Sequence, residues 1–396
     1  MKMNNSVLVV GGGIAGLTTA QSLADFGINV TIVENDLSIG GLLKDLGFVF
    51  PTSDCALCYE PIGSCFTADS VRKCQYRAAF SFIPNLEIAC PASVLTAERT
   101  KNRIRVTIQW QARKIDPKKC VACGLCAAKC PLDAISLPHP QAIPRTYWID
   151  ESKCNPKKCK TECVEACIVD AFDFDNEGKK ESREFDAVVL ATGFKEQRPS
   201  YLPYCLDEFN ETITQVELAN LLDNMKVKEF FGPNNKKIGR ILMIFCAGSR
   251  DTRSTEACSD ICCSYSLKHA IRLRELGIEV TVTFMDIRTP GNLEDLYTTA
   301  REEGVHFIRG RPGFVEKDEK NNLLVHLENT QQSKMLEIAT DLVVLAANLQ
   351  ITTPSSDTWE GIPTFRVGSP RILNIPQTTN QAKSVALEVI EILREL

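Results

Sequence analysis

Long uncharged stretches are missing from this sequence of 396 residues. No run approaches the roughly 18 apolar residues that a membrane-spanning helix needs, so we expect any membrane association to come only through partners. Basic residues are not in excess, because the net charge is −5, and this gives no reason to expect nucleic-acid binding. Histidine is scarce, with 4 residues, and neither a Ser-His-Asp set nor a paired-carboxylate site stands out. The sequence therefore offers little scope for catalysis by side chains alone.

A signal peptide is also missing. The sequence begins MKMNNSVLVVGGG and runs straight into an apolar strand pattern, without a charged segment and a cleavage site. We therefore expect a cytoplasmic protein. With 44% hydrophobic and 24% charged residues the composition is ordinary for a globular protein, and the chain is long enough for two or three domains.

Cysteine is the residue that the sequence has in excess, with 18 copies. In a small secreted protein this number would indicate a disulfide framework. In a large chain without a leader, and with tight Cys-x-x-Cys spacings, it favours bound metal. Isolated Cys205 is expected to be a plain buried thiol.

The amino-terminal residues follow the pattern of a dinucleotide-binding fold. Residues 6–10 form a short apolar run typical of a buried parallel strand, and a glycine-rich turn then leads into a helical pattern. Gly11 permits the tight turn, Gly13 lets the backbone approach a pyrophosphate, and Gly16 lets the helix pack close to the strand. The N–H groups at the start of the helix, around Ala15, favour a phosphate.

A second strand at residues 30–33 ends on Glu34, whose carboxylate can bind ribose hydroxyls. Because strand, glycines, helix, strand and acid occur in register, a nucleotide site is favoured over a simple glycine turn. The later pair Gly40-Gly41 and the strand with Ala-Thr-Gly at residues 185–193 resemble segments of two-dinucleotide-domain flavoproteins, which favours FAD. The residues predicted to bind FAD are Gly11, Gly13, Ala15, Gly16, Glu34, Asn35, Gly40, Gly41, Leu42, Ala191, Thr192 and Gly193.

The second half of the sequence repeats this pattern. Residues 241–245 again read as a buried strand, and a later strand at residues 280–285 ends on Asp286. Residues 341–348 then echo residues 186–193. This indicates an internal duplication, as in flavoproteins with one FAD domain and one NAD(P)-type domain.

The phosphate loop of the second copy is not preserved. It reads Cys-Ala-Gly-Ser-Arg-Asp at residues 246–251, and with one glycine left a nicotinamide nucleotide is not the expected ligand. Four cysteines near the opening of one helix could hold an iron–sulfur cluster, since the helix dipole helps to stabilise an anionic centre. They are Cys246, Cys258, Cys262 and Cys263. The alternative is a pair of buried thiols plus a redox-active pair, although a disulfide between adjacent cysteines is strained.

Residues 120–131 carry the strongest single motif, Cys-x-x-Cys-x-x-Cys-x-x-x-Cys-Pro. This spacing wraps three thiolates around one 4Fe–4S cluster and sends the fourth to a neighbouring cluster. A zinc site could use four cysteines, but the Cys-Pro ending and the dense spacing favour iron and sulfur. The predicted cluster ligands of this module are Cys120, Cys123, Cys126 and Cys130, followed at wider spacing by Cys154, Cys159, Cys163 and Cys167.

By analogy with two-cluster ferredoxins, Cys167 would join the first three cysteines, and Cys130 would join the other three of the second set. The irregular second spacing, and Ile168 where proline is usual, depart from the ferredoxin pattern. Nearby lysines could dock an acidic partner or simply form a solvated face. These lysines are Lys118, Lys119, Lys157, Lys158 and Lys160.

The predicted fold class is α/β, with two Rossmann-like domains arranged as in thioredoxin reductase and an inserted ferredoxin-like two-cluster module. We expect the FAD-binding domain at residues 1–111 and 181–235, the 4Fe–4S insert at 112–180, the second Rossmann-like domain with the cysteine cluster at 236–340, and a return to the FAD domain at 341–396.

These motifs together resemble the A subunits of heterodisulfide reductase and their relatives over nearly the whole chain. Further matching segments lie at residues 50–56, 245–251, 258–268 and 367–370. The resemblance implies an oxidoreductase subunit that carries FAD and about three 4Fe–4S clusters and relays electrons between partner subunits. It implies that those partners are B- and C-type iron–sulfur subunits of such a complex. It also implies that the four cysteines of the second copy match the family's unusual cluster site.

The sequence ends at Leu396 without the extra carboxyl-terminal ferredoxin module of the long methanogen-type subunit, and so resembles shorter versions in sulfur-metabolism and quinone-interacting complexes. One alternative is a self-contained NAD(P)H-dependent oxidoreductase like the small subunit of glutamate synthase, which the loop at residues 246–250 argues against. Another is a flavin-dependent disulfide reductase that uses Cys55-x-x-Cys58. A group of extra cysteines is left open between a further metal site, a lining of the flavin pocket and buried thiols: Cys55, Cys58, Cys65, Cys74 and Cys90.

Overall fold

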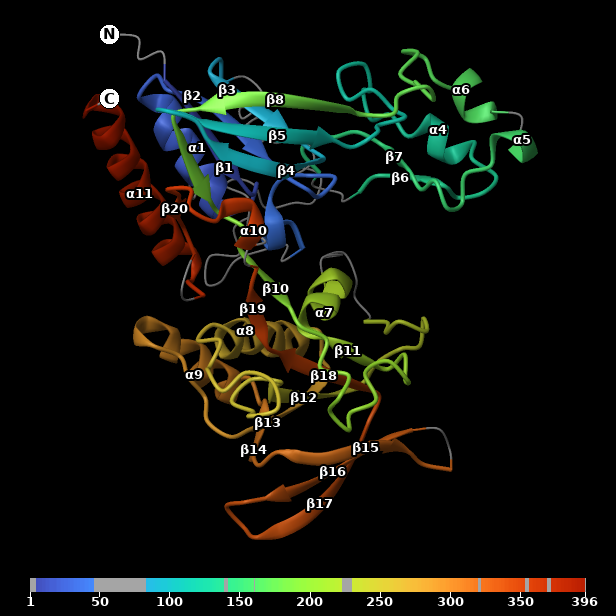
Figure 1. Cartoon of the computed structure of the whole chain (residues 1–396). Helices are drawn as coiled ribbons and strands as arrows, with labels where there is room; N and C mark the ends of the chain where they lie inside the picture. Colours follow the sequence, from blue (N-terminus) through green and yellow to red (C-terminus); the bar gives the residue numbers. More distant parts are fainter. Residues whose placement is uncertain are drawn as a thin grey trace.

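The computed structural model describes residues 5–45, 83–138, 142–159, 161–222, 230–319, 322–352, 356–368 and 372–395. Two parallel five-stranded sheets, joined in one chain, confirm the predicted α/β architecture (Figure 1). None of the helices in these ranges is long and apolar enough to cross a bilayer.

The first sheet has the strand order β20-β9-β1-β2-β3 and is parallel throughout. Its strands are β1 (Ser6–Val10), β2 (Asn29–Val33), β3 (Leu86–Ala89), β9 (Ala187–Leu190) and β20 (Phe365–Arg366). Val7 and Val9 pack against α1 (Ile14–Asp25) and α11 (Ile375–Glu395), whereas Leu8 faces the opposite side. Because both faces are covered, β1 is apolar along its length, as a buried parallel strand must be.

The opposite side of this sheet is covered by a three-stranded antiparallel sheet. Its strands are β4 (Ala92–Arg99), β5 (Ile104–Trp110) and β8 (Lys179–Phe185), with α10 (Ser356–Trp359) nearby. Alternate residues of β5, namely Ile104, Val106 and Ile108, point into this core, which is the period expected of a strand with one buried face.

The second sheet has the order β11-β18-β12-β13-β14 and is also parallel. Its strands are β11 (Thr212–Thr214), β12 (Arg240–Ala247), β13 (Glu279–Phe284), β14 (His306–Arg309) and β18 (Leu342–Ala347). One core joins it to α7 (Gln215–Leu222), α8 (Cys262–Glu275) and α9 (Glu294–Glu302). The other joins it to the antiparallel strands β15 (Pro312–Lys317), β16 (Leu323–Asn329) and β17 (Lys334–Thr340). Each half is thus a parallel sheet between helices and a small antiparallel sheet.

The chain passes between the two sheets through an antiparallel pair, β10 (Phe194–Glu196) and β19 (Leu349–Ile351). This corrects two expected boundaries. Strand β11 and helix α7, predicted in the FAD domain, belong to the second unit, and so does β18, predicted in the carboxyl-terminal return. The reason is that sheet membership follows from pairing with β12 and β18. The echo of residues 186–193 by residues 341–348 already indicates this for β18, whereas β11 has no such local signal.

The insert extends from the paired ends of β5 and β8, where Trp110 lies opposite Lys179 (Figure 1). It contains the antiparallel strands β6 (Ile135–Ser136) and β7 (Trp148–Ile149) and the short helices α4 (Leu125–Ala128), α5 (Pro156–Cys159) and α6 (Glu162–Glu165). Its small core combines Ile115, Ile135, Ile149 and Ala171 with cysteine side chains. The insert therefore has its own core, built around the predicted ligands.

Candidate functional site

The glycine loop after β1 packs against the backbone that follows β9. Gly11 has a φ of +109°, and a Cβ atom there would lie 2.2 Å from the carbonyl oxygen of Ala191. A Cβ atom on Gly16 would lie 1.9 Å from the carbonyl oxygen of Gly11. Both approaches are far below van der Waals contact, so only glycine fits at these two positions. The structure thus brings the first glycine loop and the Ala191-Thr192-Gly193 segment together.

Gly13 is different, because it is not required for packing within the described residues. A Cβ atom there would meet only Gly41 Cα, at 3.8 Å, and its φ of −77° suits any residue. Gly40 donates its N–H to the carbonyl oxygen of Gly12 at 2.8 Å, so the two glycine loops lie side by side. The space beside Gly13, at the start of α1, fits the pyrophosphate of a dinucleotide.

Glu34 stands at the edge of this cradle. One carboxylate oxygen accepts the Gly12 N–H at 2.7 Å and the other accepts the Asp36 N–H at 2.9 Å. The side chain of predicted Asn35 instead accepts an N–H from Gln111 at 3.2 Å. Leu42 lies in the short helix η1 (Gly41–Asp45) that follows the second glycine loop. The carboxylate of Glu34 is therefore the acidic group that the fold holds against the glycine loop.

The eight cysteines of the insert fall into two neighbourhoods. Burial raises the pKa of Cys126 to about 11, and the charges of Cys120, Cys123 and Cys167 act in the same direction. Burial also raises the pKa of Cys163, and there the acting thiols are Cys159, Cys130 and Cys154. These neighbourhoods coincide with the two ligand sets expected from the spacing. Within the described ranges, no three Cys, His, Asp or Glu side chains are grouped tightly enough for a single metal ion.

Backbone N–H groups point at the sulfurs of the insert. Ala134 donates to Cys130 Sγ at 3.4 Å and Ala171 donates to Cys167 Sγ at 3.3 Å, each from four residues downstream. Donors of this kind stabilise thiolates and bound clusters.

The matching bonds reflect a repeat that cysteine spacing alone does not reveal. Residues 115–120 and 149–154 both read Ile-Asp-x-x-Lys-Cys, and residues 130–134 and 167–171 both read Cys-x-x-Asp-Ala. The main chain repeats as well, since Cys120 and Cys154 each donate their N–H to the aspartate carbonyl four residues earlier at 2.9 Å. The repeat is a signal in the sequence that places the second half of the insert.

The third cysteine group lies between the end of β12 and the start of α8. Cys246, Cys262 and Cys263 are buried, and Cys258 lies within range of their charges. A hydrogen bond from Cys262 lowers the pKa of Cys263 to about 7, helped by the backbone N–H and the charge of Arg288. The structure therefore places three of the four predicted residues in the buried region at the start of α8, with Cys258 within range of their charges.

Four buried hydroxyl groups in this region have no hydrogen-bond partner within the described part of the chain: Ser249, Ser264, Tyr265 and Ser266. Three of them lie in the first turns of α8, and the Cys262 and Cys263 charges act on Tyr265. Buried hydroxyls are normally paired, because leaving one unpaired costs about 1–3 kcal/mol. Because Ser264, Tyr265 and Ser266 are consecutive in α8, their hydroxyls point to different sides of the helix and do not together define one ligand site.

The second unit differs from the first where a ribose would bind. Asp286 follows β13 as Glu34 follows β2, but its carboxylate pairs with Arg250 at 2.8 Å and with Arg309 at 3.5 Å. Arg250 comes from the altered phosphate loop, with a φ of +55°. Asp286, the acidic residue at the ribose position, is thus neutralised by Arg250, which belongs to the loop at the phosphate position.

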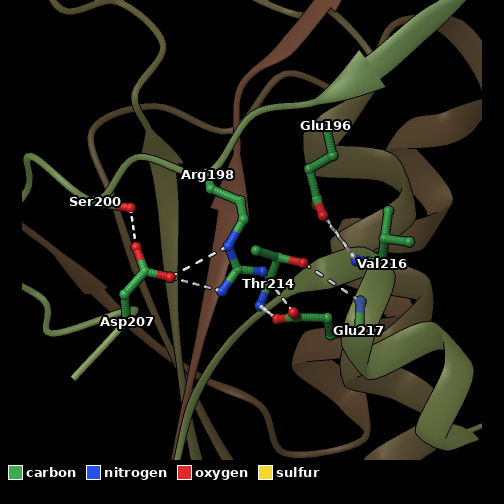
Figure 2. A network of polar contacts seen from close by, with 7 residues as sticks. All are labelled: Glu196, Arg198, Ser200, Asp207, Thr214, Val216 and Glu217. Atoms are coloured by element: carbon green, nitrogen blue, oxygen red, sulfur yellow. Dashed lines mark hydrogen bonds and ion pairs between the residues drawn. The ribbon is translucent and has the colours of Figure 1, made fainter. Parts of the chain in front are cut away.

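A polar network lies where the chain enters the second unit (Figure 2). Thr214 and Glu217 form a capping box at the start of α7, because Glu217 accepts the Thr214 N–H at 2.8 Å and donates its own N–H to the Thr214 hydroxyl at 3.4 Å. Glu196, at the end of β10, accepts the Val216 N–H at 3.3 and 3.4 Å. Arg198 adds an ion pair to Glu217 at 2.5 Å. The network fixes the strand connection to the first helix of the second unit.

Glu196 makes this junction sensitive to pH. Burial raises its pKa from the ordinary value of 4.5 to about 7, against the hydrogen bonds from Thr214 and Val216. A carboxyl group whose pKa rises on folding stabilises the fold fully below pH 4.5, and this stabilisation is lost as the pH rises through 7. The loss is at most about 3 kcal/mol. Glu196→Gln, which keeps an acceptor oxygen, is expected to lose less thermal stability than the unmodified protein between pH 5 and pH 8. Parallel Tm curves over this range would contradict the assignment.

The remaining cysteines divide between thiols bonded to backbone carbonyls and residues that are not described. Cys90 donates its S–H to the Asp36 carbonyl at 3.1 Å, and burial raises its pKa to about 12, so it is a neutral thiol. Cys205 donates to the Val315 carbonyl at 3.3 Å. Cys55, Cys58, Cys65 and Cys74 lie outside the described residues, as do Lys160 and residues 50–56.

Two family models match parts of the chain. A 4Fe-4S binding domain matches residues 113–136, and an NAD(P)-binding Rossmann-like domain matches residues 9–51. The first covers the start of the insert and the second covers the first glycine loop and Glu34. Together they support iron–sulfur binding and a flavin-type nucleotide-binding fold.

Curated relatives match most of the chain. It is 33% identical over 372 residues to the iron–sulfur A subunit of the CoB–CoM heterodisulfide reductase of Methanocaldococcus jannaschii. It is 35% identical over 375 residues to the first of two such A subunits from Methanopyrus kandleri. Each match covers 88% of this chain and 54% of the relative, so the chain spans about half the length of the curated relatives it matches.

Solved structures share the fold at low identity. The thioredoxin reductase of Lactococcus lactis (FR conformation) has a TM-score of 0.55 and 13% identity, covering 99% of this chain and 100% of the other. That of T. acidophilum has a TM-score of 0.53 and 13% identity, covering 98% and 99%. The predicted arrangement of two Rossmann-like domains is confirmed.

Proposed function

This chain is homologous to the A subunits of heterodisulfide reductases over 88% of its length, and from that relationship we propose that it is an FAD- and iron–sulfur-containing electron-transfer subunit of a heterodisulfide-reductase-like complex. The observation that supports the proposal is the insert, in which the charges of Cys120, Cys123 and Cys167 act on Cys126 and those of Cys159, Cys130 and Cys154 act on Cys163, and which is joined directly to the nucleotide-binding half through β5 and β8. Bound FAD would exchange electron pairs, whereas 4Fe–4S clusters exchange single electrons.

The protein's own residues would hold three kinds of group. Gly13 and the start of α1 would receive the FAD pyrophosphate, and Glu34 would exchange its bonds to backbone N–H groups for the ribose hydroxyls. The two neighbourhoods of the insert would each supply four thiolates to a cluster. A third cluster would bind Cys246, Cys258, Cys262 and Cys263, and the charges of the other three thiols, which act on Cys262, support its placement there.

Other members of the complex remain part of the proposal. The relatives are named as subunits, which supports an assembly with further subunits. We infer that these are B- and C-type iron–sulfur subunits, that the protein is cytoplasmic, and that it reaches a membrane only through them. A nucleic-acid partner is not proposed, since the net charge is −5.

Anaerobic analysis of iron, sulfide and flavin in the purified protein tests this function. We expect one FAD and about twelve irons per chain, because three 4Fe–4S clusters carry four irons each. A preparation with about eight irons would leave only the insert loaded. Absence of flavin, or a zinc content that replaces iron, would contradict the proposal.

The same preparation separates the proposal from an NAD(P)H-dependent oxidoreductase. Because Arg250 neutralises Asp286 in the second unit, stoichiometric NADH or NADPH is expected to leave the flavin absorbance of the isolated protein unchanged. Dithionite, which needs no binding site, should bleach it and serves as the positive control. Rapid bleaching by either nucleotide would instead favour a self-contained oxidoreductase like the small subunit of glutamate synthase.

A further inference from the structure

Arg113 is a buried cation with two unpaired donors at the base of the insert. It follows β5 by three residues and is 7% exposed. Its Nη2 donates to the Leu37 carbonyl at 2.8 Å, whereas Nε and Nη1 are buried without a partner among the described residues. A buried guanidinium in this state is costly unless an anion lies nearby. The position therefore calls for a negative charge that the bond to Leu37 does not supply.

Neighbouring Lys114 shows the contrast. Its Nζ donates to the carbonyl oxygens of Phe174 and Asn176 at 2.9 and 2.8 Å, so its hydrogen-bonding groups are used within the insert. Arg113 has no such set of acceptors, and its two remaining donors find none in the part of the chain that the structure describes. The need for an anion is thus particular to Arg113.

Two thiols lie within range of the Arg113 charge, Cys90 and Cys120. Cys90 is held as a neutral thiol by burial and by its bond to the Asp36 carbonyl, so it does not supply an anion. Cys120 is one of the proposed cluster ligands, and as a ligand it is a thiolate within a cluster of net negative charge. Of these two thiols, the one that would supply a negative charge to Arg113 is therefore Cys120, as a ligand of the proposed cluster.

The guanidinium group of Arg113 also contacts the segment that leads into Gly40-Gly41, through its bond to the Leu37 carbonyl. Besides the bond to Leu37, Ile143 of the insert donates its N–H to the Ser38 hydroxyl at 2.7 Å and accepts the Ile39 N–H at 3.0 Å. The insert thus holds three consecutive residues of the loop that precedes the second glycine pair. Arg113 is bonded to this loop, and Cys120 lies within range of its charge.

We propose that Arg113 is a positioning residue that raises the reduction potential of the cluster held by Cys120, Cys123, Cys126 and Cys167, by holding a buried positive charge with unpaired donors at the base of the insert, within range of Cys120. When such a cluster gains one electron its net negative charge increases by one, and a nearby cation stabilises the reduced form. No bond forms or breaks. The inference rests on the proposed function, because it needs that cluster to be present.

The test uses the full chain loaded with FAD and clusters, and a redox titration of each cluster followed by EPR. Arg113→Met removes the charge but keeps an extended side chain, and Arg113→Lys keeps the charge. We expect Arg113→Met to lower the equilibrium constant for reduction of one insert cluster about tenfold, which is about 59 mV for a one-electron couple. Arg113→Lys should shift it much less. The affected signal should be the one that Cys126→Ala removes.

Arg105→Met is the matched control, because it removes the same charge from the strand that leads to Arg113. Arg105 is exposed and paired with Glu184 at 2.9 Å, so its loss is expected to leave every potential unchanged.

Four results would overturn the inference, the last of them together with the proposed function. An unchanged potential in Arg113→Met with full iron content excludes the electrostatic role. Equal falls in the Met and Lys variants would assign the effect to hydrogen-bond geometry, not to charge. Loss of FAD from Arg113→Met with unchanged cluster potentials would show that the guanidinium group interacts with the nucleotide and not with the cluster. If iron analysis shows no cluster at the Cys120 set, the proposed function fails together with the inference, whereas a loaded cluster with an unmoved potential defeats the inference alone.

Discussion

Cys262→Ala is expected to lower the iron content from about twelve to about eight per chain and to remove one EPR signal from the reduced protein. The side chain is buried at the start of α8, and the charges of Cys246, Cys258 and Cys263 act on it. Removing one of four thiolates opens a buried cluster to loss. Because the insert lies in a separate core, its eight irons should stay.

Cys205→Ala is the matched control for this variant. Cys205 is a cysteine of the same half whose thiol donates to the Val315 carbonyl, and its removal should leave iron unchanged. If Cys262→Ala retains the iron of the unmodified protein, the third group is not a cluster site. The region would then hold buried thiols, with the pKa of Cys263 lowered by its hydrogen bond to Cys262.

Gly13→Val is expected to abolish FAD binding while the protein stays folded and keeps its iron. The backbone at Gly13 is extended and a Cβ atom there meets only Gly41 Cα at 3.8 Å, so the protein itself accepts a Cβ atom at this position. The added atoms would occupy the space that the pyrophosphate needs, because the backbone must approach the phosphates closely. Flavin content should fall at least about a hundredfold relative to iron, measured by absorbance after gel filtration.

Substitutions at two other glycines distinguish a specific loss of FAD binding from a loss of protein stability. Gly16→Ala should destabilise the fold itself, since its Cβ atom would lie 1.9 Å from the Gly11 carbonyl oxygen. Gly239→Ala should do neither, because the nearest atom to a new Cβ is Asp341 Oδ2 at 3.5 Å. Retention of FAD by a folded Gly13→Val protein would place the nucleotide elsewhere.

Features encoded by short sequence patterns are predicted well. The glycine loop, the second glycine pair and the Ala-Thr-Gly segment come together as expected, because each follows a strand whose neighbours are set by Rossmann topology. The insert is found from cysteine spacing for the same reason. Each of these motifs spans only a few residues, so it can be recognised without knowledge of distant contacts.

Features that depend on long-range packing are predicted poorly. The expected boundaries place strands β11 and β18 in the wrong half. Only pairing with the second sheet reveals the place of β11, whereas the echo of residues 186–193 by residues 341–348 already indicates that of β18. Arg113 and Glu196 were missed altogether. A charged residue in a sequence looks solvated, and its burial emerges only when distant segments, here Leu37 and Val216, are brought against it.

The pairing of Trp110 with Lys179 has a consequence for how this architecture could arise. Strands β5 and β8 are neighbours in an antiparallel sheet, and the whole insert begins and ends at adjacent positions. A turn of about two residues would close them into an ordinary hairpin without disturbing the pairing of the sheet, although the bonds of Arg113 and Ile143 to residues 37–39 would be lost. In evolutionary terms, a cysteine-rich module can replace the turn of a β-hairpin at this position. The strand pairing of the FAD-binding half stays the same with or without the insert.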